Sequence, residues 1–204
     1  MWDLDWEQHL PWEFENVRCE AGTFGEALPF IAEHYSSIFG LKDEEPRFHP
    51  DPMTEAKRRF GDEMDVFLFR AKDRSERVAG VLACHPSDWS TYYIRSLAVL
   101  PEYRTGNLVP PLILRLSEVL SAVGCERLEC ETSPSNTVVM RVLPRIDFIL
   151  TASSNSERWG TMVRFTKFLR RDAESAFQRQ FCGVRVKSAR PSEGGSDLLP
   201  RRMP

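Results

Sequence analysis

The stretch most suited to chemistry runs from Leu97 to Val109, where a strand, a short polar loop and a helix start follow one another. An apolar segment ends at Leu100, and Pro101 stops the strand from continuing. The loop from Arg104 to Asn107 then leads into an apolar helical pattern. In such a loop, backbone N–H groups and the positive end of a helix converge on one point. This arrangement favours the binding of a phosphate group.

Helices and strands must position this loop, and hydrophobic periodicity predicts their order. The expected strands are 14–21, 65–70, 77–83, 91–100, 127–132, 148–152 and 159–168, and the expected helices are 23–39, about 51–64, 108–123, 137–143 and 171–181. Strands predominate in the middle and helices flank them. We therefore expect an α/β (α+β) fold with one mixed sheet covered by helices on both faces.

Two helix starts carry recognisable caps. Thr23 is followed three residues later by Glu26, which is the spacing of a capping box. The next helix is expected to begin with Asp51 as its cap and Pro52 in its first turn.

The two ends of the chain differ from its middle. Trp2, Trp6 and Trp12 stand among acidic residues, and they fit an arm packed on the domain, a partner site or part of an acceptor pocket. From residue 183 the chain is rich in Ser, Gly, Pro and Arg without periodicity, which is typical of a disordered tail. We expect an arm over 1–13, one domain over 14–182 and a tail over 183–204.

The composition excludes several classes of protein. A chain of 204 residues suits one domain, and a net charge of −3 gives no general attraction to nucleic acid or anionic membranes. Apolar runs stay below the ~18 residues of a membrane span, and the acidic first residues do not fit a signal peptide. The five cysteines form neither a disulfide ladder nor metal-ligand pairs. We expect a cytoplasmic protein with reduced, buried thiols and no metal.

The loop resembles the pyrophosphate-binding motif of the GNAT superfamily of N-acetyltransferases, in which a strand and a PEYR segment precede R/Q-x-x-G-x-G/A. Arg104 matches the first position of that motif. Asn107 replaces the first glycine, and asparagine tolerates positive φ. Val109 replaces the last Gly or Ala, and its branched side chain narrows the approach to a ligand. Pro110 and Pro111 lack N–H groups but fall in the first helical turn, where proline is tolerated.

A second segment strengthens the resemblance, which covers about residues 66–169. The segment from Glu131 to Phe148 is similar to the family's strand with Glu followed by N-x-x-A-x-x-L-Y-x-x-x-G-F. Asn136 matches the asparagine that opens a helix and often contacts the pantetheine arm. Leu143 stands where the family often has its proton-donating tyrosine, and Pro144 follows it.

The resemblance implies that a splay between the fourth and fifth expected strands binds acetyl-CoA or another acyl-CoA. Backbone groups of the fourth strand would pair with pantetheine, and one N–H there would bond the thioester carbonyl. The cofactor-binding residues implied are Leu97, Ala98, Val99, Arg104, Thr105, Gly106, Asn107, Leu108, Val109 and Asn136.

The resemblance also implies a general base. Glu131 matches the family glutamate that deprotonates the amine directly or through water. A second interpretation stays open, because Glu129 and Glu131 alternate on one strand face and can be solvated or paired with Arg127.

The proton donor is less clear, because leucine at the tyrosine position cannot donate a proton. Tyr92, Tyr93, His85 and bulk water are the substitutes that the sequence offers.

Three functions fit these residues. The first is an N-acyltransferase that acts on a small amine, an amino acid or a peptide. The second is a GNAT-fold module that binds acyl-CoA without chemistry, as the lost glycines and tyrosine would suit. The third is an N-acyl synthase that takes its acyl group from an acyl carrier protein. No nucleic-acid or membrane partner is expected, and a homodimer is left open.

Removing the chain after Gly183 is expected to leave the melting temperature and CoA binding unchanged. The tail has too little apolar surface to offset the entropy lost on ordering. Thermal denaturation of the full and truncated chains checks this, and a loss of several degrees would show that the tail packs.

Overall fold

The computed structural model describes residues 2, 4–39, 53–73, 75–104, 108–156 and 159–182. The strands are β1 (Trp12–Glu13), β2 (Val17–Gly22), β3 (Asp65–Ala71), β4 (Val78–Pro86), β5 (Thr91–Val99), β6 (Arg127–Thr132), β7 (Ile149–Ser156) and β8 (Gly160–Phe168). The α-helices are α1 (Phe24–Ile38), α2 (Glu55–Asp62), α3 (Val109–Ala122), α4 (Thr137–Val142) and α5 (Arg171–Phe181). Three 3-10 helices are η1 (Trp6–Gln8), η2 (Pro101–Tyr103) and η3 (Leu143–Ile146).

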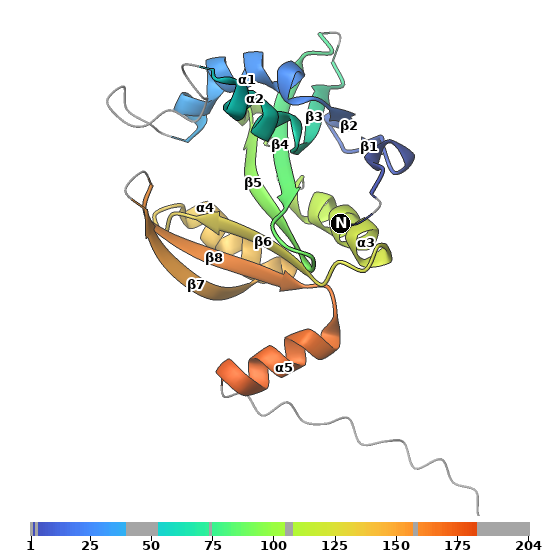
Figure 1. The fold of residues 1–204 in the computed structure, drawn as a ribbon. Coiled ribbons are helices and arrows are strands. Elements are labelled where there is room, and N and C mark those ends of the chain that lie inside the picture. Colours follow the sequence, from blue (N-terminus) through green and yellow to red (C-terminus); the bar gives the residue numbers. More distant parts are fainter. Residues whose placement is uncertain are drawn as a thin grey trace, which may run out of the picture. The chain divides into compact units, whose positions relative to one another are not determined.

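The described strands form one mixed sheet in the order β1-β2-β3-β4-β5-β6-β8-β7. Neighbours are antiparallel except β5 and β6, which are parallel and are joined by the crossover helix α3. Figure 1 shows α1 and α2 packed over one side of the β3–β5 ribbons and α3 on the other side. The expected α/β fold is therefore confirmed, and the short strand β1 is an addition to the expected elements.

The start of α1 is fixed by the capping box expected from the sequence. Thr23 Oγ1 accepts a hydrogen bond from Glu26 N at 3.2 Å, and Glu26 Oε2 accepts one from Thr23 N at 2.8 Å. Two N–H groups at the helix end are satisfied in this way, so the first turn does not depend on solvent.

The second helix starts later than expected. Its cap is Thr54, whose Oγ1 accepts from Lys57 N at 3.3 Å, while Asp51 and Pro52 lie outside the described residues. Gly61 lets this helix approach α1 closely, because a Cβ there would lie 2.2 Å from a ring carbon of Phe24. This contact fixes α2 above the same sheet face as α1.

Two of the N-terminal tryptophans belong to the hydrophobic core. The Trp6 ring lies 4.8 Å from Phe67, 6.0 Å from Trp12 and 6.0 Å from Tyr92, measured between ring centroids. Both tryptophans are buried. Of the three interpretations of this segment, packing on the domain therefore describes Trp6 and Trp12.

From Arg171 onward the chain belongs to a second unit, of which residues 171–182 with helix α5 are described. None of the α5 side chains is buried, and the rings of Phe177 and Phe181 lie 5.4 Å apart on it. Among the described helices, none has the length and hydropathy needed to cross a membrane.

Replacing Trp6 by Ala is expected to lower the free energy of unfolding by about 3–5 kcal/mol, because it removes a large ring from a packed aromatic cluster. Trp89, which is 76% exposed, provides the matched control. Trp89→Ala should change stability by less than about 0.5 kcal/mol. Urea denaturation compares the two, and equal losses would contradict the packing role of Trp6.

Candidate functional site

The parallel strands β5 and β6 separate after their first four residues. Residues 91–94 pair with 127–130, whereas β5 continues to Val99 and β6 to Thr132. The β4–β5 register shifts at the same place, because Cys84 pairs with Ile94 but Ala83 with Ser96. Arg95 is therefore the extra residue of a β-bulge, which bends a strand locally. The result is an opening between the two strands.

Backbone groups of β5 face this opening. Leu100 N donates to Ala79 O at 2.8 Å, so the amide and carbonyl of Val99 point away from β4 and toward the β6 side. Leu97 occupies the same alternating position two residues earlier and is half-buried. Ala98 and Val99 are buried. An extended ligand chain could thus add to β5 as a further strand would.

The loop after β5 is tied back to that strand. Arg104 Nε donates to Val99 O at 2.8 Å, just beyond η2. Thr105, Gly106 and Asn107 lie outside the described residues. This hydrogen bond holds the Arg104 side chain at the end of the open β5 edge.

The start of the helix that follows has no negative charge that would repel an anion, but it offers few N–H donors. Leu108 is the cap residue, without a side-chain hydrogen bond, and α3 begins at Val109 with no acidic residue in its first turn. Pro110 and Pro111 stand in that turn, as expected, and contribute no N–H groups. Few helical N–H groups therefore remain to bind a phosphate here.

The carboxylates of β6 pair with β8. Arg164 Nε and Nη2 donate to Glu131 Oε1 at 3.0 and 2.9 Å, and Arg164 Nη1 lies 3.6 Å from Glu129 Oε2. Arg127 turns elsewhere and donates to Ser90 Oγ at 2.6 Å. Pairing with Arg127 was therefore the wrong alternative, because the register places Glu131 opposite Arg164.

Hydrogen bonding, burial and charge near the opening raise the pKa of three groups. The hydrogen bond with Glu131 raises the pKa of Arg164, which stays a cation. Burial, helped by the negative charge of Glu131, raises the pKa of Tyr93 to about 12. Burial and the charge of Glu129 raise the pKa of Cys130 to about 12, so this neighbouring thiol is not a ready nucleophile.

The three side chains expected as possible proton donors differ in burial. Tyr92 is fully buried, donates to Asp65 Oδ2 at 2.5 Å and packs against Trp6. Tyr93 and His85 lie with their ring centroids 5.4 Å apart and are only partly buried. Burial removes Tyr92 from consideration and leaves the other two beside the opening.

The segment after β6 is helical, as expected, but short. Asn136 caps α4, with its Oδ1 accepting from Val139 N at 3.3 Å. The helix ends at Val142, and the 3-10 helix η3 continues it through Pro144. Leu143 is buried there, so its position is filled by core packing.

Two contacts near the opening join residues that are distant in the sequence. Tyr35 of α1 has its hydroxyl 3.1 Å from Ser96 Oγ, and burial raises the pKa of Tyr35 to about 12. The Arg95 guanidinium lies over the Phe60 ring, 5.2 Å from its centroid. Hydrophobic periodicity predicts that Tyr35 lies in the core, but it predicts neither the contact of Tyr35 with Ser96 nor that of Arg95 with Phe60.

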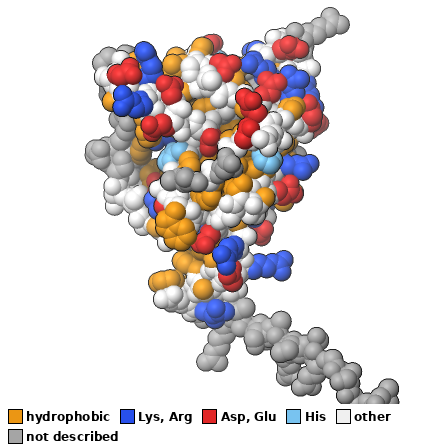
Figure 2. Space-filling model, turned by 45° about the vertical axis from the view of Figure 1, so that its right-hand side comes forward, with side chains coloured by type: hydrophobic (Ala, Val, Ile, Leu, Met, Phe, Trp, Pro, Cys, Tyr) orange, Lys and Arg blue, Asp and Glu red, His pale blue; other side chains and the backbone are white. Residues whose placement is uncertain are grey.

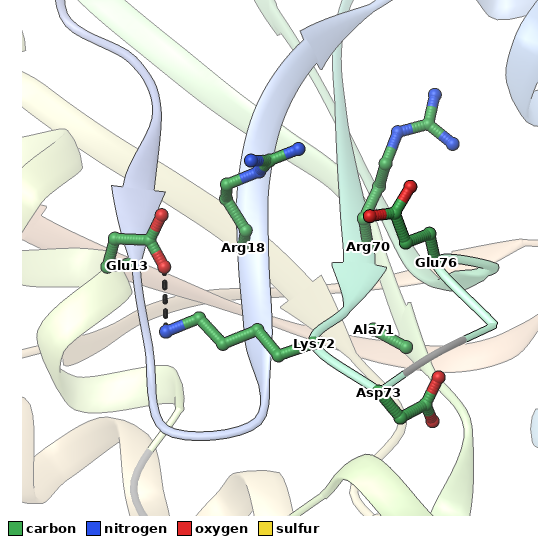
Figure 3. Close-up of a pocket in the computed structure, with 7 residues that line it drawn as sticks. All are labelled: Glu13, Arg18, Arg70, Ala71, Lys72, Asp73 and Glu76. Carbon is green, nitrogen blue, oxygen red and sulfur yellow. Dashed lines mark ion pairs between the residues drawn. The ribbon is translucent and has the colours of Figure 1, made fainter.

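Two hollows lie away from the opening. One has a volume of about 350 Å³ and is lined by Glu13, Arg18, Arg70, Ala71, Lys72, Asp73 and Glu76. Lys72 forms an ion pair with Glu13 there (Figure 3), with Nζ 2.7 Å from Oε2. The other, of about 220 Å³, lies between residues 13–17 and the segment of Tyr103, Leu108 and Pro111. The first is lined mainly by charged side chains of both signs.

The surface charge is mixed. Figure 2 shows basic and acidic side chains interspersed on the face in view, with hydrophobic side chains between them. Within the described residues, no three His, Cys, Asp or Glu side chains are grouped so that they could hold a metal ion.

Comparison with known proteins agrees with this geometry. The model of the acetyltransferase (GNAT) family matches residues 28–148, more than half of the chain. No curated protein matches the chain.

Solved structures match it at low identity. A ribosomal-protein-S5-alanine acetyltransferase from Vibrio fischeri is 12% identical, with a TM-score of 0.58 and coverage of 79% of this chain and 98% of that one. A GNAT family acetyltransferase from Elizabethkingia anophelis with acetyl-CoA bound is 13% identical, with a TM-score of 0.51 and coverage of 76% and 99%. A Bacillus subtilis acetyltransferase in complex with CoA is 18% identical, with a TM-score of 0.51 and coverage of 76% and 99%. At these identities the likeness establishes the fold alone.

Proposed function

The chain belongs to the GNAT acetyltransferase family, and from this premise we propose that it is an N-acyltransferase. The donor is acetyl-CoA or another acyl-CoA, and the acceptor is an amine. The observation that carries the proposal is the open edge of β5 beyond the bulge at Arg95. The Elizabethkingia and Bacillus proteins of the same fold hold acetyl-CoA and CoA, respectively.

The proposed cofactor site uses backbone and loop. Pantetheine would pair with the backbone of Leu97 and Val99, and the pyrophosphate would bind the loop at residues 104–109. The hydrogen bond from Arg104 to Val99 O supports this site, because it holds the first residue of the motif at the strand edge. Asn136 would reach the pantetheine arm from the start of α4.

The proposed reaction is a direct transfer. The amine nitrogen attacks the thioester carbonyl carbon, the C–S bond breaks, and the CoA thiolate leaves. Glu131 takes the proton that the amine gives up, directly or through water. Arg164 orients the carboxylate through two hydrogen bonds to Glu131 Oε1.

The thiolate must then gain a proton. A thiol ordinarily has a pKa of about 8.5, whereas Tyr93 and Tyr35 have pKa values of about 12. Proton transfer from either tyrosine to the thiolate is therefore uphill. We propose that the proton taken from the amine by Glu131 passes through water to the thiolate, and that Tyr93 acts as a hydrogen-bond donor.

A second function is favoured by one observation. Pro110 and Pro111 remove two N–H groups from the helix start that would hold the pyrophosphate. A chain with weakened cofactor binding and Leu143 at the tyrosine position fits a GNAT-fold acyl-CoA binding module. Measurable turnover separates the two functions.

The proposal has consequences for the setting of the protein. All five cysteines are free, which fits a reducing compartment, so we propose a cytoplasmic location. Residues 14–182 would form the catalytic domain with 1–13 as its arm. A carrier-protein donor and a homodimer stay open within this proposal.

Adding CoA is expected to raise the melting temperature, because a ligand that binds the native state stabilises it by mass action, about 2.7 kcal/mol at a concentration of 100 times Kd. Pantetheine, which lacks the pyrophosphate, is the matched control and should raise it less. Differential scanning fluorimetry measures both. No shift with millimolar CoA, acyl-CoA or a carrier-bound thioester would contradict the proposed cofactor site.

Replacing Glu131 by Gln is expected to lower turnover by roughly 10²-fold or more, as loss of a general base does, and to remove the rise of rate with pH. CoA affinity should stay the same, because the carboxylate is assigned to the amine and not to the pyrophosphate. Thiol release and CoA titration measure the two effects.

The matched control is Glu118→Gln, which changes an exposed carboxylate on α3. This variant should keep the full rate. If Glu131→Gln also keeps a near-full rate with an unaltered pH profile, Glu131 is not the base and catalysis rests on positioning.

A further inference from the structure

Arg95 is placed by the bulge at the mouth of the opening between β5 and β6. Its side chain is exposed, and its guanidinium lies over the half-exposed ring of Phe60 on α2. Other arginines of this region are paired: Arg164 with Glu131, and Arg127 with Asp88 at 3.7 Å. Among the described residues, no carboxylate forms an ion pair with Arg95. Its guanidinium is held by an aromatic face and offers its donors outward.

Stacking on Phe60 also orients these donors. A guanidinium over a ring gains from the cation–π interaction while its N–H groups stay available in its plane. Five N–H donors in a fixed fork match the two oxygens of a carboxylate. The Phe60 ring is 47% exposed and can contact an apolar group of the same ligand. The pair is thus built to receive an anion with an apolar part.

His85 and Tyr93 lie near Phe60 on the same face. Phe60 contacts His85, with ring centroids 6.3 Å apart, and His85 contacts Tyr93. Burial is the main cause of the raised pKa of Tyr93; the negative charge of Glu131 raises this pKa further, and the positive charge of Arg95 lowers it. A negative and a positive group therefore lie within electrostatic reach of one tyrosine.

The group around Glu131 and the Arg95 side chain carry opposite net charges. Arg164 serves both Glu129 and Glu131, so this group of three carries one net negative charge. Arg95 carries one net positive charge. A dication such as a polyamine would be attracted by the first and repelled by the second. A molecule with one amine and one carboxylate is complementary to both.

We propose that the acceptor is a small zwitterion of the amino-acid class, whose carboxylate is bound by Arg95 while its amine lies at Glu131. The inference rests on the proposed N-acyltransferase function and narrows its acceptor. Arg95 is then a specificity-determining residue that contacts the substrate. A peptide N-terminus, whose first carboxyl group is an amide, would lack this contact.

The test compares amino acids with their own carboxamides as acceptors, with acetyl-CoA as donor and thiol release as the readout. The native chain should use the free amino acids with a kcat/KM at least about 10-fold higher, as expected for a charge-assisted hydrogen-bonded contact. Arg95→Met should lower kcat/KM for amino acids by about 10- to 100-fold, mainly through KM, and leave the amides unchanged.

Two further variants make the test sharp. Arg95→Lys keeps the charge but loses the fork, and it should recover only part of the preference. Arg115→Met removes an exposed arginine of α3 and should leave the preference intact. Thermal denaturation checks that each variant folds, and if Arg95→Met unfolds, the lysine variant decides by the same comparison.

The outcomes separate the inference from the function beneath it. Equal use of amino acids, amides, peptides and polyamines, with no effect of Arg95 substitution, overturns the carboxylate contact while the N-acyltransferase function stands. A preference that disappears in Arg95→Met but not in Arg115→Met supports it. If no acceptor of any kind gives thiol release and CoA does not stabilise the chain, both the carboxylate contact and the N-acyltransferase function are overturned.

Discussion

The short parallel pairing of β5 with β6 is the constraint on which the site depends. Antiparallel neighbours hold both strands on their outer sides, so the two can diverge without breaking the sheet. The divergence begins at the bulge of Arg95, where one added residue changes the direction of β5. It leaves a row of backbone donors and acceptors at the centre of a sheet, where such groups are otherwise paired. A ligand that completes the pairing therefore finds an edge that the protein already holds rigid.

The ion pairs at the opening join residues of different strands. Arg164 on β8 bridges the two carboxylates of β6, which lie on the same face two residues apart. Without this cation, Glu129 and Glu131 would repel each other in a partly desolvated place. The strand register that places Glu131 opposite Arg164 thus sets the surroundings of the proposed base.

Much of the fold could be predicted because it is encoded locally. Periodicity gave the element order, and the spacing of Thr23 and Glu26 gave the first helix start. The cap of α2 was missed because Thr54 and Asp51 are both competent cap residues, and local sequence does not rank them. The partner of Glu131 was beyond prediction, since pairing β6 with β8 skips over β7. The Arg95 bulge likewise depends on a register between strands and leaves no sequence signature.

The packing of the N-terminal tryptophans bears on how the chain acquires its structure. Trp6 packs against Phe67 of β3 and against Tyr92 of β5, which comes from near the middle of the chain. Contacts between residues so far apart close late, since the loop entropy must be overcome before the contact is gained. During synthesis the first segment leaves the ribosome well before its partner strand exists. Trp6 cannot gain its contact with Tyr92 until β5 has been made, so chain elongation sets the earliest moment at which its full packing can form.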